Sequence, residues 1–409
     1  MVQSLSANKE QDRVKSGFWG TDFWFLLLYS LLPGIYKILG NQLLMLGCLP
    51  IIVYMLYRWR SEIRIYKIDT IFLLLIIYLG LQSVAWMLFP NVNKTGIAMG
   101  IFMDIIPMAG YVLAKGMDFK YFAQVLIRVI FVHCIIGIIL YPPFRITSAS
   151  NPIVNTLVEG VAFGRMASVS GSLGFGNLLM TGFILSFFFA RRYLPLMLIC
   201  LIFSAQRSAW VGGFFVLIVY VLGLLKNFKL AKVFSFILVA IVLVLGIFWF
   251  VDSILGIDLG FITSRFSELT TAGSERDFLW KAGIDNFKSY PLGVGVGQVG
   301  QIASRADGAE SAFALVPDGD YFRVLSEFGI VGGLYYAITL FFFFLILLFV
   351  KLTTISQQAI VALMGGNLIQ MIGSNVSEFY FTNFIYWIVF GYFFILVGKV
   401  ISFKRFQST

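Results

Sequence analysis

The stretch Ser274-Glu275-Arg276-Asp277-Phe278-Leu279-Trp280 lies in the one long polar segment of this sequence, which runs from about Val251 to Tyr321. Apolar runs dominate the rest of the 409 residues. Hydrophobic residues make up 59% of the chain, and the mean hydropathy is +0.91. A chain of this composition keeps such a polar segment only if the segment has a task. We therefore expect the functional residues to lie in it or next to it.

The composition is typical of a membrane protein. Only 12% of the residues are charged, against roughly a quarter in soluble domains. Apolar runs close to the bilayer-spanning length of about 20 residues recur along the whole chain. The expected fold is therefore all-α, a polytopic helical membrane protein. The net charge of +10 does not indicate a nucleic-acid partner, because topology decides where the basic residues of a membrane protein fall.

Twelve apolar stretches predict twelve transmembrane helices, with one large loop between the ninth and the tenth. They lie near residues 22–39, 41–57, 70–89, 96–114, 121–141, 171–190, 193–206, 208–225, 232–251, 322–350, 357–376 and 380–402. With this count, every basic cluster between and beyond the helices falls on the same side of the membrane. By the positive-inside rule that side is the cytoplasm, and both termini lie there.

This topology divides the chain into three parts. Residues 1–251 hold the first nine helices and an outer loop at 142–170. Residues 252–321 form the large outer loop, for which we expect short amphipathic helices. Residues 322–409 hold the last three helices and a cytoplasmic tail. The polar motifs fall at the outer face, so the working side is predicted to be external.

The cysteines and the single histidine argue against metal or thiol chemistry. Cys48, Cys134 and Cys200 all lie in apolar runs, where cysteine acts as a small packing residue. His133 also lies in an apolar run, which favours a packing role. We expect no metal and no cofactor.

Three glycines, Gly295, Gly297 and Gly300, fit the dinucleotide-binding pattern GxGxxG. No strand precedes them and no βαβ unit surrounds them, so the pattern does not predict a nucleotide site. We expect these glycines to let the backbone turn tightly after Pro291.

Arg207 and Arg165 are candidates for binding an anion. Arg207 stands between two short apolar runs, at or just below the outer interface. Its guanidinium can reach lipid headgroups by snorkelling, or it can clamp a lipid-borne phosphate with its forked donors. The absence of an acidic residue near it in the sequence favours the clamp. Arg165 lies in an outer loop rich in small and polar residues and carries a weaker signal.

Arg276 is predicted to lie in the first turn of a short amphipathic helix. Ser274 and Asp277 fit the Ser-x-x-Asp pattern of a helix start, and apolar residues follow at helical spacing. A positive charge is unfavourable at a helix N-terminus. Arg276 is therefore either a solvated surface residue or, as we favour, a second anion ligand.

Asp318 and Asp320 precede the tenth predicted helix, followed by Tyr321 and Arg323. Carboxylates here can cap the helix, or one of them can take a proton from an attacking sugar hydroxyl. The candidates for catalysis are Asp318, Asp320 and Arg276. The candidates for substrate binding are Arg165, Arg207, Glu275, Arg276, Tyr321 and Arg323.

The order and spacing of five motifs resemble the superfamily of Wzy-type O-antigen polymerases and O-antigen ligases, bacterial GT-C-type glycosyltransferases. The motifs are Gly164-Arg165 with Ser172 and Asn177, Gln206-Arg207-Ser208-Ala209-Trp210, Glu275 to Trp280, Pro291 to Gly295, and Glu327 to Gly332. The resemblance covers the second half of the chain, and the first half only by topology. Ligases of the family carry a histidine eleven residues before the first glycine of a Gly-x-x-Gly pair. Asp318 takes that position here, which favours a polymerase and leaves the base open among Asp318, Asp320 and none.

The resemblance implies an enzyme of the bacterial inner membrane that works at the periplasmic face without a metal. It would transfer a glycan from undecaprenyl pyrophosphate onto the end sugar of another lipid-linked repeat unit. Its partners would be that lipid-linked oligosaccharide, membrane lipid and a separate chain-length regulator protein. The alternatives are a ligase that transfers the glycan onto lipid A-core and, from another class, a flippase for lipid-linked oligosaccharides. A flippase would place polar residues at the midplane of broken helices, whereas here Asp104 is the main polar residue inside a predicted span.

Overall fold

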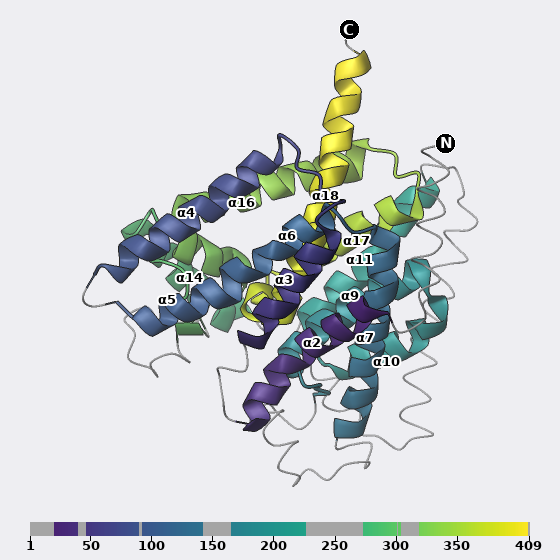
Figure 1. The fold of residues 1–409 in the computed structure, drawn as a ribbon, viewed down its shortest axis with the longest axis horizontal. Helices are drawn as coiled ribbons and strands as arrows, with labels where there is room; N and C mark the ends of the chain where they lie inside the picture. The colour runs from purple at the N-terminus through teal and green to yellow at the C-terminus, as the bar shows by residue number, and fades with distance from the viewer. Residues whose placement is uncertain are drawn as a thin grey trace.

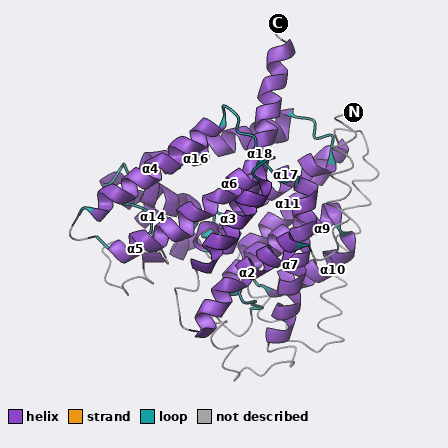
Figure 2. Cartoon of the chain, viewed as in Figure 1, coloured by secondary structure: helices purple, strands orange, loops and turns teal. Residues whose placement is uncertain are grey.

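The computed structural model describes residues 20–39, 46–89, 92–141, 165–225, 273–300, 302–303 and 319–407. Within these residues the fold is helical and contains no strand, as predicted (Figure 2). The α-helices are α2 (Thr21–Leu39), α3 (Cys48–Trp59), α4 (Asp69–Met87), α5 (Lys94–Gly100), α6 (Ala109–Ala114), α7 (Phe119–Leu140), α9 (Ser172–Phe189), α10 (Leu194–Phe203), α11 (Arg207–Leu225), α14 (Gly273–Ser289), α16 (Asp320–Phe349), α17 (Ile355–Gln370) and α18 (Tyr380–Gln407). The turns η2 (Ile101–Ile105), η3 (Ile106–Met108), η5 (Arg191–Tyr193) and η7 (Val376–Glu378) complete them.

Helices cover the predicted apolar stretches, except that 232–251 lies outside the described residues. Among the described segments, five are long and apolar enough to cross a membrane: Asp69–Met87, Lys94–Ala114, Phe119–Leu140, Asp320–Phe349 and Tyr380–Val400. Shorter apolar helices follow the predicted stretches at 22–39, 41–57, 171–190 and 208–225. The total of twelve crossings stays a prediction.

α18 forms the centre of the bundle, and α4 and α16 lie at its edge (Figure 1). In the apolar window of α18, 89% of the residues are buried, against 28% for α4 and 33% for α16. The large exposed residues of α4 and α16 are leucine, isoleucine, valine and phenylalanine, which suit contact with lipid. The end of α18 projects beyond the other helices.

Close packing in the bundle depends on small residues. A Cβ atom at Gly212 of α11 would lie 2.6 Å from the carbonyl oxygen of Gly366 on α17, and one at Gly366 would lie 2.8 Å from the carbonyl oxygen of Gly212. Facing glycines of this kind let helix backbones approach closely inside a membrane. His133 also has the predicted packing role, because its ring nitrogens lie 2.8 Å from the hydroxyl oxygens of Ser30 and Ser168.

The ends of several helices meet at one end of the bundle, which the predicted topology makes the outer end. The amide of Met166, just before α9, donates to the carbonyl of Phe203 at the end of α10. The amide of Gly319, just before α16, donates to Asn375 in the connection between α17 and α18. The helix predicted over 357–376 stops at Gln370, and residues 371–379 form this connection instead. The connection therefore lies against the start of α16.

Candidate functional site

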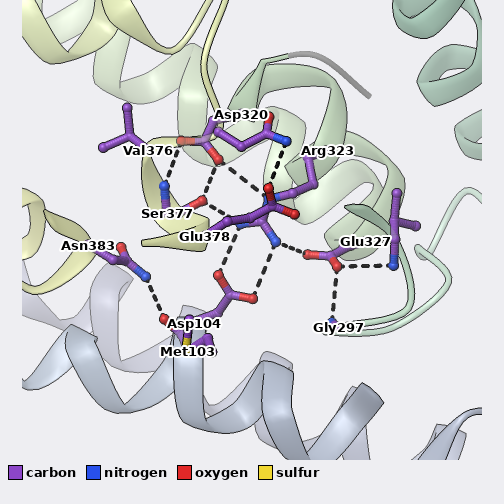
Figure 3. A network of polar contacts seen from close by, with 12 residues as sticks. Met103, Asp104, Gly297, Asp320, Arg323, Glu327, Val376, Ser377, Glu378 and Asn383 are labelled. Carbon is purple, nitrogen blue, oxygen red and sulfur yellow. Dashed lines mark hydrogen bonds and ion pairs between the residues drawn. The ribbon is translucent and has the colours of Figure 1, made fainter. Parts of the chain in front are cut away.

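A buried network of charged side chains joins three distant parts of the chain (Figure 3). Arg323, in the first turns of α16, is 1% exposed. Its Nη2 lies 3.0 Å from Oδ1 of Asp104 and its Nη1 lies 3.3 Å from Oδ2 of the same carboxylate. Its Nε lies 3.4 Å from Oδ1 of Asp320, and it also contacts Glu327 and Ser377. The guanidinium therefore holds the fourth predicted span, α16 and the α17–α18 connection together.

Helical spacing brings the α16 members of this network to one face. Asp320, Arg323 and Glu327 follow one another at intervals of three and four residues, which places their side chains side by side on a helix. Both Asp320 oxygens are engaged: Oδ2 accepts the amide of Ser377 at 2.9 Å, and Oδ1 accepts its hydroxyl. Asp320 thus fixes the α17–α18 connection to the start of α16.

A break in the fourth predicted span presents Asp104 to Arg323. Asp104 lies in η2, a single π-helical turn between α5 and η3, and such turns are frequent at functional sites. Pro107 has no N–H to donate to the carbonyl of Met103 four residues earlier. Asn383 of α18 supplies a donor instead, with its Nδ2 at 2.8 Å from that carbonyl. The sequence therefore breaks the helix at Asp104 and satisfies the break from α18.

Acidic side chains outnumber basic side chains in the described network. Asp104, Asp320, Glu327 and Glu378 are each at most 2% exposed and surround the single guanidinium of Arg323. Neutral donors contribute as well: the amides of Gly297 and Val299 lie 3.0 and 3.3 Å from Oε1 of Glu327. In a low-dielectric interior, a carboxylate is tolerated only where ion pairs and hydrogen bonds satisfy it. Removal of the guanidinium would therefore leave several buried acids without their main partner.

Residues 293–300 of the glycine-rich segment 291–300 are packed inside the protein, although the sequence predicts an outer loop there. Its residues from Gly293 to Gly300 are buried, and Gly293, Gly295, Gly297 and Gly300 have positive φ, which confirms the predicted tight turns. A Cβ atom at Gly297 would overlap the carbonyl oxygen of Gly96 in α5. Because the amide of Gly297 donates to a carboxylate of the protein itself, this part of the GxGxxG match is not a phosphate cradle.

A kink at Gly329 (φ 61°, ψ −142°) divides α16 into a buried first part and a longer second part. At the kink, the amide of Ile330 donates to the carbonyl of Pro291 at 2.8 Å. Gln82 of α4 donates to the carbonyls of Leu292 and Glu327, at 2.6 and 2.9 Å. Irregular backbone within a membrane must find such partners inside the protein. These contacts stabilise the kink, and the kink directs the first part of α16 toward the charged network.

Gly297→Ala is expected to lower the melting temperature in detergent by several degrees or to prevent folding. The new Cβ meets the Gly96 backbone, and alanine does not readily adopt a φ of +72°. Gly80→Ala in α4 is the matched control, because nothing lies within 4 Å of its Cβ position. An unchanged melting temperature for Gly297→Ala would show that segment 291–300 does not pack as described.

A second polar cluster lies where α9, α11 and α17 meet. The amide oxygen of Asn177 accepts from Nε2 of Gln206 at 2.8 Å and from Nε2 of Gln370. Nε2 of Gln206 also lies 3.2 Å from the hydroxyl oxygen of Ser374. Asn177 Nδ2, Gln206 Oε1 and Gln370 Oε1 are buried and have no hydrogen-bond partner among the residues that the structure describes. These atoms keep unused hydrogen-bonding capacity, and Gln206 directly precedes Arg207.

The structure places part of the predicted site. Arg207 is the first residue of α11, and Arg165 adjoins Met166, which pairs with the end of α10. Both arginines are half-buried. Tyr321 donates its hydroxyl to the carbonyl of Leu368 at 2.8 Å. Arg165, Arg207 and Tyr321 therefore lie at the same end of the bundle as the amide cluster.

The predicted amphipathic helix is present as α14 and packs on the start of α16. The rings of Trp280 and Phe322 are stacked with centroids 5.2 Å apart, whereas Phe278 is 64% exposed. Glu275 and Arg276 lie in its first turn, and their side chains are outside the described part of the structure. Asp318 lies outside the described residues altogether.

Sequence reasoning missed several members of the two polar clusters. The sequence assigns Asp104 no role and includes Glu327 only as part of a motif. It does not single out Ser377, Glu378, Gln370 and Ser374, because they lie inside or between predicted spans. A usable signal existed for Glu327, since it stands four residues after Arg323 within an apolar stretch.

Among the residues described, no group of histidine, cysteine, aspartate and glutamate has the arrangement of a metal site. A family model described as O-antigen ligase matches residues 193–337. No curated protein and no solved structure matches the chain. The matched residues include Arg207, α14 and the first part of α16.

Proposed function

We propose that this chain is a polymerase of lipid-linked glycan repeat units, and the match of residues 193–337 to the O-antigen ligase family model supports this. It transfers a growing glycan from undecaprenyl pyrophosphate onto the end sugar of a second lipid-linked unit. One observation favours a polymerase over a ligase: Asp318 occupies the position at which the ligases of the family have histidine. The only histidine of the chain, His133, is buried in α7 between two serine hydroxyls.

The bond changes require charge stabilisation more than a strong nucleophile. The acceptor hydroxyl attacks the anomeric carbon of the donor glycan, and the bond from that carbon to the pyrophosphate oxygen breaks. The pyrophosphate stays on its lipid, and the hydroxyl proton passes to a base. Arg207 and Arg276 are proposed to bind the pyrophosphate, because fixed guanidinium groups in a low-dielectric site stabilise the charge that develops there.

The contacts of Asp320 favour Asp318 as the base. The Asp320 carboxylate is 0% exposed and accepts from Ser377 and Arg323, so it organises the start of α16. We assign Asp320 that positioning role and Asp318 the proton transfer. The amide cluster of Asn177, Gln206 and Gln370 supplies donors and acceptors for sugar hydroxyls beside Arg207.

Asp318→Asn is expected to reduce turnover by about 100-fold or more, the usual contribution of a general base, with an unchanged melting temperature. Asp320→Asn is expected to lower the melting temperature as well, because a carboxylate of the Arg323 network is lost. Turnover is measured with purified enzyme and the lipid-linked repeat, and melting by light scattering in detergent. Full activity of Asp318→Asn would remove it as the base.

The function is tested with purified protein and undecaprenyl-pyrophosphate repeat units as the sole substrate. A ladder of multiples on a glycan gel is the expected result. Product formed only after lipid A-core is added would instead establish the ligase.

A flippase is a second candidate because of one observation. Arg323, Glu327 and Asp104 lie within candidate spans, beside a π-helical turn and a kinked helix, which are features of transporters. The expectation that Asp104 is the main polar residue inside a span was therefore wrong. Protein-dependent movement of the lipid-linked repeat across vesicles, without any glycan ladder, would favour this candidate.

A further inference from the structure

A cavity of ≈ 360 Å³ lies at the end of the bundle opposite the candidate site. The predicted topology places this end in the cytoplasm. The cavity lies between α7 and the turn that joins α9 to α10. Its lining residues are Gln124, Ile127, Arg128, Phe189, Ala190, Arg191, Arg192 and Tyr193.

Three guanidinium groups from two separate segments line this cavity, and no carboxylate is among its lining residues. Arg128 is half-buried on α7, whereas Arg191 and Arg192 are exposed in η5. Tyr193 packs its ring against Phe131 of α7, with centroids 5.0 Å apart. This aromatic contact fixes the α9–α10 turn to α7, one helical turn beyond Arg128.

General rules explain only part of this arrangement. Arg191 and Arg192 follow the C-terminal end of α9, where cations offset the helix dipole, and basic residues are common on the cytoplasmic side. Neither rule accounts for Arg128, which lies about 13 Å along α7 from Phe119 at 1.5 Å per residue. Gln124 lies one turn before it on the same face. α7 therefore contributes the guanidinium of Arg128 and the amide of Gln124 to the cavity. The α9–α10 turn lines the cavity from the other side.

We propose that this cavity binds a phosphate anion, namely the headgroup of an anionic phospholipid in the leaflet on that side. Guanidinium groups present paired donors that match phosphate oxygens. A volume of this size is within the range of about 300–1,000 Å³ for small-ligand sites. Basic pockets between membrane helices bind acidic headgroups, and the half-buried Phe189 offers an apolar wall for the adjoining lipid. The site does not depend on the proposed glycan chemistry.

The test titrates short-chain phosphatidylglycerol into purified protein in an uncharged detergent and counts bound lipids by native mass spectrometry. Phosphatidylcholine serves as the zwitterionic comparison. The variant Arg128→Gln/Arg191→Gln/Arg192→Gln is expected to bind phosphatidylglycerol at least about tenfold more weakly, because charge-assisted hydrogen bonds are lost. Arg60→Gln/Arg64→Gln/Lys67→Gln is the matched control, since it removes the same charge on the same predicted side and none of its residues lines the cavity.

Inorganic phosphate in a parallel titration separates the two sources of the anion. Displacement of phosphatidylglycerol by phosphate alone would support the anion site and identify a soluble ligand. Equal weakening in the control, or no preference of the wild type for phosphatidylglycerol over phosphatidylcholine, would overturn the proposal. If the triple variant does not fold, Arg191→Gln/Arg192→Gln tests the same expectation, because both side chains are exposed.

Discussion

Arg323→Met is expected to destabilise the protein by about 3–5 kcal/mol, the usual result of breaking a buried ion pair from one side. The substitution keeps most of the apolar stem but removes the positive charge. Asp104, Asp320 and Glu327 then lose their shared partner in a site that is closed to water. The loss is measured as yield of monodisperse protein and as melting temperature in detergent.

A compensated variant separates charge from packing. Arg323→Met/Asp104→Asn/Glu327→Gln removes two of the carboxylates along with the guanidinium. It is expected to recover part of the lost stability, because replacing a whole buried ion-pair group is far less harmful than removing one member. If Arg323→Met were as stable as the wild type, the network would not hold the three segments together.

Arg207→Ala and Arg276→Ala are each expected to lower kcat/KM for the lipid-linked repeat by about 100- to 1,000-fold, the range found when one donor to a developing charge is removed. Each would act on the pyrophosphate leaving group, so kcat falls along with kcat/KM. Turnover is followed as the rate of ladder formation on a glycan gel. Lysine at either position is expected to restore only part of the rate, because its ammonium lacks the forked donors of guanidinium.

Arg60→Ala is the control for this pair, since Arg60 is exposed next to Tyr57 at the opposite end of the bundle. It is expected to retain full turnover. Wild-type rates in both Arg207→Ala and Arg276→Ala would show that these arginines do not bind the pyrophosphate. A lower melting temperature of either variant would show that its arginine has a structural role.

The sequence predicted the helical fold well because membrane helices follow from local composition. Runs of apolar residues near 20 in number identify the spans without reference to tertiary contacts. The end of α17 was placed too late, since Gly373, Ser374 and Asn375 lie in a stretch that still reads as apolar overall. The composition of a sequence window does not show where side chains of another helix form hydrogen bonds with the backbone.

The arrangement of the polar residues could be predicted only in part. Arg207 and Arg323 were identified because charges are rare in this chain. Their partners could not be identified, because Asp104 and Arg323 are 219 positions apart and come together only in the folded chain. The burial of residues 293–300 was also missed, since their many glycines resemble those of a surface turn. Gly297 has to be glycine because it lies in close contact with Gly96 of α5, and this contact forms only when the helices pack together.

Asn383 has a consequence for how the protein is made. A ribosome produces Met103 and Pro107 long before Asn383, which follows Met103 by 280 positions. The fourth span therefore enters the bilayer before the side chain that completes its proline break exists. Until the last helix arrives, we expect the carbonyl of Met103 to use another partner, such as water or a neighbouring helix. Chains truncated before Asn383 should accordingly be recognised and degraded by membrane quality control, even though they contain the first eleven predicted spans.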